Sequence, residues 1–544
     1  MGPDLIAQVP GAGFDGPDVA WFALSPLLVL VGAALLLLLA GALTPTWPKG
    51  LYAVGASLAA IVAGGLAMMQ WDDITDGGVA TLVAGALAFD TFAMFVTITI
   101  CATLVLVSLL MSDQLRRAGA DGPEHYALFL VVGAGGVVMG AANDLIVLFL
   151  GLETLSLGLY VLAASNRRRA KSQESGMKYF ILGGFSSAFF LYGIALVYGA
   201  TGSTNIGEMV AAFDTNIPVG DDADTMLLAG IALLVVGFAF KVAAAPFHVW
   251  TPDVYEGAPI PVTALMASVG KVAAFAALLR VLVVGLGYYR DDWRPIIWVL
   301  ALVSLVVGSV LAVVQTNVKR MLAYSSINHA GFMLVGLEAA GHRAGEFDSG
   351  RGVPAVLVYL LAYAVMVCGT FGVVAMVART GDPALGEGPA DLDSFRGLGR
   401  RHPALALALT VFLVAQAGVP FTSGFIAKFG VITAAVDEHS YALALIAMIT
   451  SVIAAFLYLR IMVNAWVLEA PEAEGAADGT EATTVAETAT PATVASAGPS
   501  GRPTAAIPLH SGLAIGTAVA FTLFVGIVPG WLLDAADVAV AFAR

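Results

Sequence analysis

The sequence is poor in charged residues and in cysteine. Only 12% of its 544 residues are Asp, Glu, Lys or Arg, whereas a soluble globular chain carries about 25%. The two cysteines, Cys101 and Cys368, lie far apart in apolar runs, which excludes a disulfide framework and an iron–sulfur or zinc motif. No glycine-rich nucleotide fingerprint or phosphate-binding loop is present. The chain therefore shows no cofactor or metal site of its own, and its net charge of −14 does not suggest a nucleic-acid partner.

Apolar runs of about 20 residues, each long enough to cross the hydrocarbon core as a helix, recur along the whole chain. Hydrophobic residues make up 59% of the sequence, and the mean hydropathy is +0.89. A transmembrane barrel would instead show short alternating segments. The first 18 residues carry Asp4, Asp15 and Asp18 but no Lys or Arg, unlike the basic start of a cleavable signal peptide. We therefore predict an all-α polytopic membrane protein.

The hydropathy pattern predicts fourteen transmembrane helices. The predicted spans are residues 19–41, 51–70, 87–111, 124–141, 143–164, 175–200, 226–249, 259–286, 294–316, 320–340, 353–378, 403–436, 440–467 and 508–536. Most Lys and Arg outside these spans fall on one side, among them Arg167, Arg168, Arg169 and Lys171. Basic loops face the cytoplasm, so we predict that both termini lie on the outer side.

The spans group into five predicted regions. These are residues 1–120 with helices 1–3, 121–288 with helices 4–8, 289–468 with helices 9–13, a loop at 469–507, and 508–544 with helix 14. The loop is rich in Ala, Thr, Glu and Pro and lacks large apolar side chains. Such a segment cannot bury enough apolar surface to build a core, so we predict a disordered cytoplasmic loop.

Several ionisable residues lie inside predicted spans. Such groups cost roughly 2.5–3.5 kcal/mol or more at the bilayer centre and commonly mark an ion path. The candidates are Glu153, Lys241, Lys271, Lys428, His248 and His329. The alternative is a structural ion pair for the central residues, or a hydrogen-bonded buried imidazole for each histidine. Arg280 and Arg460 lie nearer to span ends, where we expect their side chains to snorkel to the headgroups.

Two prolines fall inside long apolar segments. Pro246 lies in predicted span seven and Pro420 in span twelve. Proline removes a backbone donor and breaks a helix, and the exposed backbone is tolerated only inside protein or beside water. Discontinuous helices at corresponding positions of two halves are typical of inverted-repeat transporters. We predict two inverted five-helix repeats, helices 4–8 and 9–13, with helices 7 and 12 broken.

Two long stretches resemble the antiporter-like membrane subunits of respiratory complex I, the NADH-quinone oxidoreductase. They are FKVAAAPFHVWTPDVYEGAPIPVTALMASVGKVAAF, which starts at Phe240, and NVKRMLAYSSINHAGF, from Asn317 to Phe332. The phrases ESGMKYFILG and FHVWTPDVYEGAP are most similar to the N type of these subunits. Lys428 stands where the M type is expected to carry glutamate, and the chain ends without the long lateral helix of the L type. The resemblance covers about residues 90–465.

The resemblance implies a proton relay across a central hydrophilic axis. In it Glu153 pairs with Lys241, Lys271 passes the proton sideways, and Lys428 holds it before release. His329 is then a possible bridge, and His248 helps to feed the site from the cytoplasm. The implied location is a bacterial cytoplasmic membrane, beside the antiporter-like M subunit and the small subunits of the complex. NADH, FMN, iron–sulfur clusters and quinone are expected in or at other subunits, with no cofactor in this chain.

Three other functions fit parts of the same pattern. A cation/proton antiporter of the Mrp type would use the same lysines without a redox partner. A membrane subunit of a hydrogenase or another relative of complex I would differ in its electron donor. A scaffold subunit would need packing residues but not the central charges, and the number of those charges argues against it.

Overall fold

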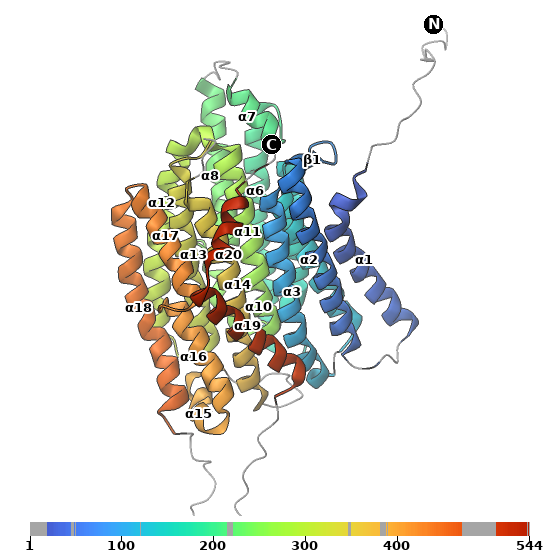
Figure 1. Cartoon of the computed structure of the whole chain (residues 1–544), viewed down its shortest axis with the longest axis vertical. Helices are drawn as coiled ribbons and strands as arrows, with labels where there is room; N and C mark the ends of the chain where they lie inside the picture. Colours follow the sequence, from blue (N-terminus) through green and yellow to red (C-terminus); the bar gives the residue numbers. More distant parts are fainter. Residues whose placement is uncertain are drawn as a thin grey trace, which may run out of the picture.

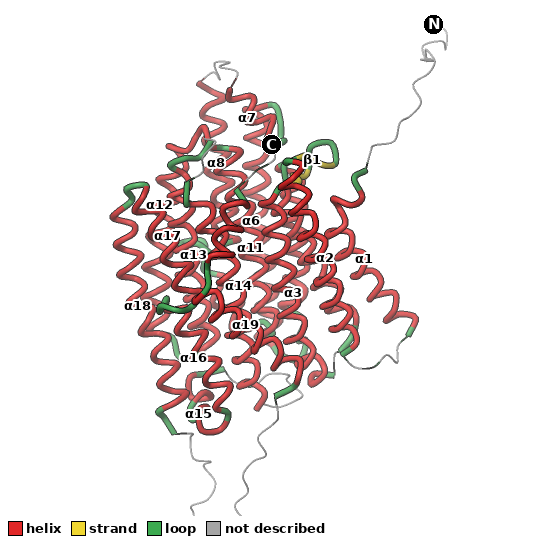
Figure 2. Tube along the Cα trace, in the orientation of Figure 1, coloured by secondary structure: helices red, strands yellow, loops and turns green. Residues whose placement is uncertain are grey.

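The computed structural model describes residues 19–44, 48, 50–119, 121–214, 221–345, 350–380, 388, 390–469, 507–540 and 542. It confirms an all-α polytopic architecture, with one small antiparallel pair of strands, β1 (Ala80–Leu82) and β2 (Leu87–Phe89). Figure 1 shows long helices side by side and steeply inclined, with α1 (Trp21–Leu43) at one edge and α18 (Tyr441–Trp466) at the other. Figure 2 places the strand pair at one end of the bundle. The predicted loop at 469–507 lies, apart from its two end residues, outside the described residues.

The helices follow the predicted order. The first part of the chain forms α2 (Leu51–Gly77), α3 (Thr91–Ala118), α4 (Pro123–Ala141), α5 (Leu145–Ala163), α6 (Ala170–Thr201), α7 (Ile206–Asp214), α8 (Asp221–Lys241), α9 (Trp250–Gly257), α10 (Ile260–Leu265) and α11 (Lys271–Leu279). The second part forms α12 (Arg290–Val313), α13 (Val318–Gly341), α14 (Gly352–Val377), α15 (Leu398–Arg401), α16 (Pro403–Ala417), α17 (Ser423–Asp437), α19 (Leu509–Ile527) and α20 (Gly530–Val538).

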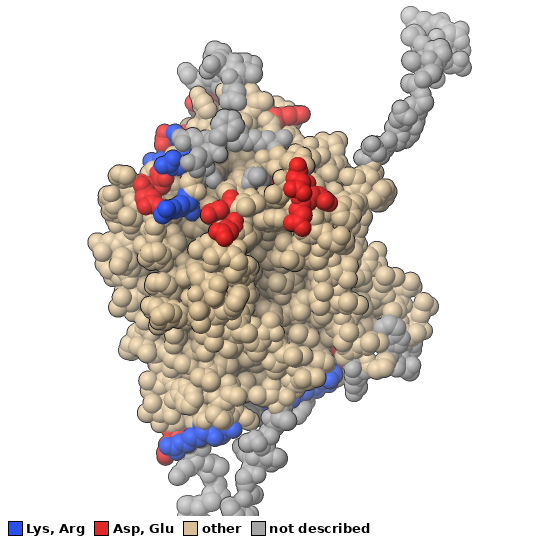
Figure 3. Space-filling model, in the orientation of Figure 1, with Lys and Arg blue, Asp and Glu red and all other residues tan. Residues whose placement is uncertain are grey.

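Twelve helical stretches of the described chain are long and apolar enough to cross a membrane. They correspond to twelve of the predicted spans. The other two predicted spans are α13, which carries several charges, and the pair α16 and α17, which are short. Figure 3 shows charged side chains at the two ends of the bundle and an uncharged belt between them. The count of fourteen spans and the two inverted repeats stay predictions.

Polar side chains cap the first turn of several of these helices. The first backbone N–H groups of a helix have no partner within it, so a side-chain oxygen accepts their hydrogen bonds. Asp90 accepts a hydrogen bond from the backbone N–H of Ala93 at the start of α3, at 2.8 Å. At the start of α5, Asp144 accepts a hydrogen bond from the backbone N–H of Ile146, at 2.8 Å. A side-chain acceptor at this position typically contributes about 1 kcal/mol.

Two predicted spans are interrupted near their prolines. α8 ends at Lys241, residues 242–249 form a non-helical link that contains Pro246, and α9 follows. α16 ends at Ala417, Pro420 lies in the link at 418–422, and α17 follows. The predicted end of span seven at residue 249 is therefore wrong, because the helix stops eight residues earlier at Lys241 and a second short helix continues beyond the link.

The last predicted span also differs from the structure. The hydropathy pattern predicts one helix over residues 508–536, but α19 ends at Ile527 and α20 begins at Gly530. Pro529 precedes α20, and proline cannot continue the hydrogen-bond ladder of α19.

Candidate functional site

Lys241 lies at the interrupted end of α8. It is the last residue of that helix and its side chain is buried. Its Nζ donates to Ser156 Oγ at 2.6 Å and to Tyr160 OH at 3.4 Å, both on α5. The carbonyl end of a helix favours a cation through its unpaired C=O groups. The interruption therefore places Lys241 at a helix end, and its ammonium bonds to two hydroxyls of α5.

Glu153 is on α5, three residues before Ser156, but it does not contact Lys241 directly. Ser187 of α6 donates a hydrogen bond to Glu153 Oε1. Among the ion pairs of the described residues none joins Glu153 to Lys241. In this structure the ammonium instead bonds to Ser156, one helical turn further along α5, and the Glu153–Lys241 pairing that the resemblance implies stays a prediction.

Lys271 begins α11, directly after the π-helical turn at Met266–Gly270. Its buried Nζ donates to the carbonyl oxygen of Ser326 in α13 at 2.7 Å. It also lies 5.6 Å from the centre of the Tyr363 ring, and Tyr363 OH donates to Ser326 Oγ at 2.8 Å. π-helical turns are frequent at functional sites. Here the turn immediately precedes the buried ammonium.

His329 is buried on α13 between two tyrosines. Its Nδ1 is 2.7 Å from Tyr359 OH, and its Nε2 is 3.2 Å from Tyr458 OH. The Tyr458 hydroxyl is also 2.6 Å from Ser325 Oγ. A neutral imidazole has one donor nitrogen and one acceptor nitrogen, so one tyrosine must donate to the ring and the other must accept from it.

Lys428 lies on α17 and reaches back across the interruption to α16. Its buried Nζ donates to the carbonyl oxygen of Ala417, the last residue of α16, at 3.1 Å, and to Ser451 Oγ at 2.9 Å. Gly418 has φ +88°, and a Cβ there would lie 2.8 Å from Lys428 Cδ. Glycine is therefore required at 418 both for the left-handed backbone and for the close passage of the lysine.

The two interrupted helices place their lysines alike. Lys241 precedes Pro246 and Lys428 follows Pro420, so their positions in the sequence look unrelated. In the structure each lysine is tied to the end of the first half of its broken helix, since Lys241 is the last residue of α8 and the Lys428 ammonium donates to the carbonyl of Ala417, the last residue of α16.

His248 stays apart from these lysines. It lies in the link after α8, half-buried, and its ring centre is 6.4 Å from that of Tyr324. Its Nδ1 is buried, and within the described residues it has no hydrogen-bond partner. The structure therefore brings His329 into the hydrogen-bonded centre of the bundle but leaves His248 at the margin of the Lys241 site.

Arg280 does not snorkel to the headgroups, so the prediction for this residue is wrong. Arg280 and Asp90 are both 0% exposed, and their side chains form two hydrogen bonds of 2.8 and 2.9 Å. Arg280 Nε also donates to the Gly140 carbonyl at 3.1 Å. The packing of α3 beside the end of the α10–α11 segment supplies a carboxylate, so the guanidinium does not need the membrane surface. Arg460 instead donates to the carbonyls of Val313 and Gln315, at 2.8 Å each.

An ion network joins the motifs that carry the resemblance. Lys178 bonds to Asp253 at 2.8 Å, and Lys171 bonds to Glu256 at 2.8 Å. Arg320 bonds to both carboxylates, at 2.6 and 3.1 Å. The network attaches α9 to α6 and α13, and thereby holds the short helix that follows the interruption after Lys241.

The hydroxyl groups that hold the lysines were not among the predicted site residues. Glu153, Ser156 and Tyr160 follow the spacing i, i+3, i+7, which places polar groups on one helix face, so this signal was available. Tyr359 and Tyr363 are four residues apart on α14 and give a weaker signal of the same kind. No three His, Cys, Asp or Glu side chains in the described ranges gather into a group that could hold a metal ion.

Comparison with known proteins gives a consistent result. Residues 142–454 match the family described as NADH:quinone oxidoreductase/Mrp antiporter, TM. The chain is 40% identical over 496 residues to NADH-quinone oxidoreductase subunit N of Mycobacterium tuberculosis, which covers 83% of this chain and 90% of that protein. A chain of respiratory complex I from Thermus thermophilus is 28% identical with a TM-score of 0.72, and the match covers 94% of this chain and 99% of the other. A chain of the Mrp complex from Dietzia has a TM-score of 0.77 at 22% identity, over 95% of this chain and 96% of the other, and shows the fold alone.

The interrupted helices, the buried lysines and these matches define an antiporter-like, multi-pass membrane protein. Proteins of this class include subunits of redox complexes as well as of Mrp antiporters. The chain belongs to the subunit N family of NADH-quinone oxidoreductase.

Proposed function

We propose that this chain is a proton-translocating subunit of NADH-quinone oxidoreductase. It couples electron transfer from NADH to quinone, carried out by other subunits with NADH, FMN and iron–sulfur clusters, to proton movement through the bundle. It lies in the bacterial cytoplasmic membrane beside the antiporter-like M subunit and the small membrane subunits, with both termini on the outer side. The proton is carried by Glu153, Lys241, Lys271, His329 and Lys428. His248 helps to feed protons from the cytoplasm into this relay.

One observation carries this proposal. Each of the three buried lysines is held by hydroxyl or carbonyl oxygens, and within the described residues none has a carboxylate within ion-pair distance. Arg280, by contrast, is locked to Asp90. A desolvated lysine can release its proton, whereas arginine stays charged. The lysines thus suit a relay, while the arginine pair suits a structural role.

The interaction energy of a Glu–Lys pair is similar to the free energy needed to move a proton across the membrane. Moving one proton against about 150–200 mV requires about 3.5–4.6 kcal/mol. A Glu–Lys pair at about 4 Å interacts by about 4 kcal/mol at an effective dielectric constant near 20. In this structure Glu153 and Lys241 bond to separate serines. We infer that forming and breaking their direct contact drives uptake and release of the proton at Lys241.

The proposal is tested by purifying the complex through a tag on this chain. We expect the subunits that bind NADH and quinone to co-purify, and NADH addition to acidify vesicles that contain the complex. An Mrp-type antiporter would instead exchange sodium for protons without redox subunits. Sodium-driven proton movement by a preparation that lacks redox subunits would contradict the proposal.

Replacing Tyr458 with phenylalanine tests the hydroxyl chain around His329. The change removes the partner of both His329 Nε2 and Ser325 Oγ while keeping the ring. A positioned proton-transfer group commonly contributes 10²–10⁴-fold, so we expect the pumping rate to fall at least about tenfold. Tyr441→Phe, at an exposed tyrosine, is the control. Equal pumping by the two variants, at equal assembly, would show that protons do not pass through Tyr458.

A further inference from the structure

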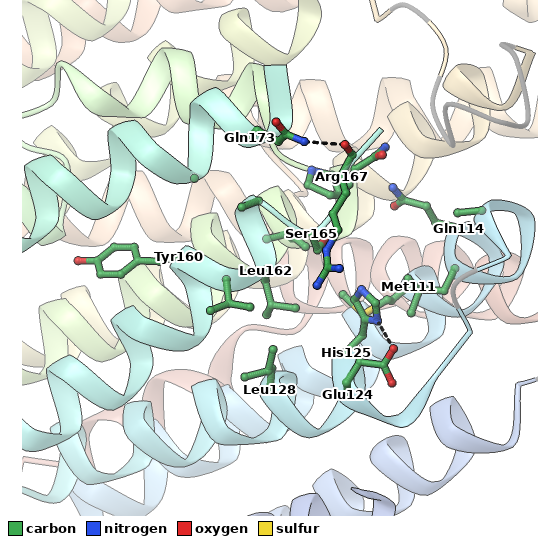
Figure 4. A pocket seen from close by; sticks show the side chains of 18 of the residues that line it. Met111, Gln114, Glu124, His125, Leu128, Tyr160, Leu162, Ser165, Arg167 and Gln173 are labelled. Carbon is green, nitrogen blue, oxygen red and sulfur yellow. Dashed lines mark hydrogen bonds and ion pairs between the residues drawn. The ribbon is translucent and has the colours of Figure 1, made fainter. Parts of the chain in front are cut away.

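A pocket of about 850 Å³ lies where α3 and α5 end and where α4 and α6 begin. Its volume is in the range of about 300–1,000 Å³ that is common for small-molecule sites. Figure 4 shows Met111, Leu128, His125, Arg167 and Gln173 among the side chains that line it. The proposed relay residues Glu153, Lys241, Lys271, His329 and Lys428 do not line it, although Tyr160, which bonds to Lys241, does.

The inner wall of the pocket is largely apolar, and it opens toward the outer surface of the bundle. Leu115, Leu128 and Val262 contribute to this wall. Val161 of α5 and Phe180 of α6 also line it, and they are 56% and 53% exposed. Both helices are long and apolar enough to cross a membrane. The pocket is therefore open to hydrocarbon on one side.

The rim of the pocket is charged. Arg167 and Arg168 follow the end of α5 and are exposed. Within the described residues neither guanidinium group forms a hydrogen bond or an ion pair. Glu124, at the start of α4, also lines the pocket, with its carboxylate 3.8 Å from His125 Nδ1. Two guanidinium groups and one exposed carboxylate thus lie at the rim of a pocket whose inner wall is largely apolar.

We propose that this pocket binds one phospholipid with an amine headgroup, such as phosphatidylethanolamine. Its phosphate binds Arg167 and Arg168, because guanidinium groups bind phosphate oxygens well. Its ammonium lies toward Glu124, and one acyl chain runs along Leu128, Val161 and Phe180. A free phosphate would leave the apolar wall unused, and a purely anionic headgroup would leave Glu124 without a cation.

The test uses the intact complex in vesicles that contain phosphatidylethanolamine with a photoreactive acyl chain. We expect cross-links to peptides that carry Val161 or Phe180. Each basic side chain near a membrane surface contributes a factor of about five to binding, so Arg167→Gln with Arg168→Gln should lower the labelling by about tenfold or more. Arg400→Gln with Arg401→Gln, a second arginine pair outside this pocket, should leave it unchanged.

The headgroup is tested with Glu124→Gln. This variant should lower labelling by the phosphatidylethanolamine probe but not by the corresponding phosphatidylglycerol probe. The proposal is overturned if the pocket stays unlabelled, if the Arg167 and Arg168 double variant labels like the wild type, or if the probe labels other subunits but not the peptides that carry Val161 or Phe180. Equal effects of Glu124→Gln on both probes would overturn the assignment of the headgroup. Equal yields of assembled complex establish that the exposed substitutions do not act through folding.

Discussion

Lys241→Ala is expected to abolish NADH-driven proton pumping by the assembled complex. The change removes the only charged group that bonds to Ser156 and Tyr160 in the described part of the chain, at the interrupted end of α8. Because a proton-transfer group commonly contributes 10²–10⁴-fold, pumping should fall by about a hundredfold or more. The measurement is NADH-dependent acidification of inverted membrane vesicles, together with the rate of quinone reduction.

Lys241→Arg separates proton transfer from charge alone. Arginine keeps the positive charge but does not release its proton, so this variant should pump as poorly as Lys241→Ala. Arg351→Ala removes an exposed basic side chain that is paired with Asp437, away from this site, and should leave pumping near the wild-type rate. Full pumping by Lys241→Arg would mean that a fixed charge suffices, and full pumping by Lys241→Ala would refute the role of this residue.

Asp90→Ala is expected to destabilise the folded subunit strongly. Asp90 and Arg280 are both 0% exposed and pair at 2.8 Å, so the change leaves a buried guanidinium without its counter-charge. Breaking a buried pair costs about 3–5 kcal/mol. The loss of the hydrogen bond from the Ala93 N–H to Asp90 at the start of α3 adds about 1 kcal/mol. Thermal unfolding of the purified complex and the yield of this subunit in membranes measure the effect.

Two further variants identify the cause of that loss. Asp90→Asn keeps an oxygen for the Ala93 N–H and removes the charge, so it isolates the ion pair from the helix cap. Asp90→Leu combined with Arg280→Met replaces both charges by apolar groups and should recover much of the stability, as such replacements often do. The exposed pair Arg400–Glu469 is the control, since breaking it should cost about 0–1 kcal/mol. A wild-type unfolding temperature for Asp90→Ala would show that the pair is not required.

Sequence reasoning could locate the buried charges but not all of their partners. The position of Arg280 near a span end suggested snorkelling, and its carboxylate lies 190 residues earlier in the chain. The Lys428 contact with Ala417 depends on how the link at 418–422 places α17 relative to the end of α16, a geometry that hydropathy does not report. The i, i+3, i+7 spacing of Glu153, Ser156 and Tyr160 could have been recognised, because it depends only on the helical repeat.

The sequence by itself determined that this chain is a helical membrane protein with lysines and prolines deep in its apolar segments. Composition and periodicity suffice for that, because the bilayer demands long apolar helices and penalises buried charge. Only the tertiary structure decided what each charge meets: hydroxyls and carbonyls for Lys241, Lys271 and Lys428, and a carboxylate for Arg280. Such contacts join helices that are distant in the sequence, and they depend on packing and on where a helix is interrupted.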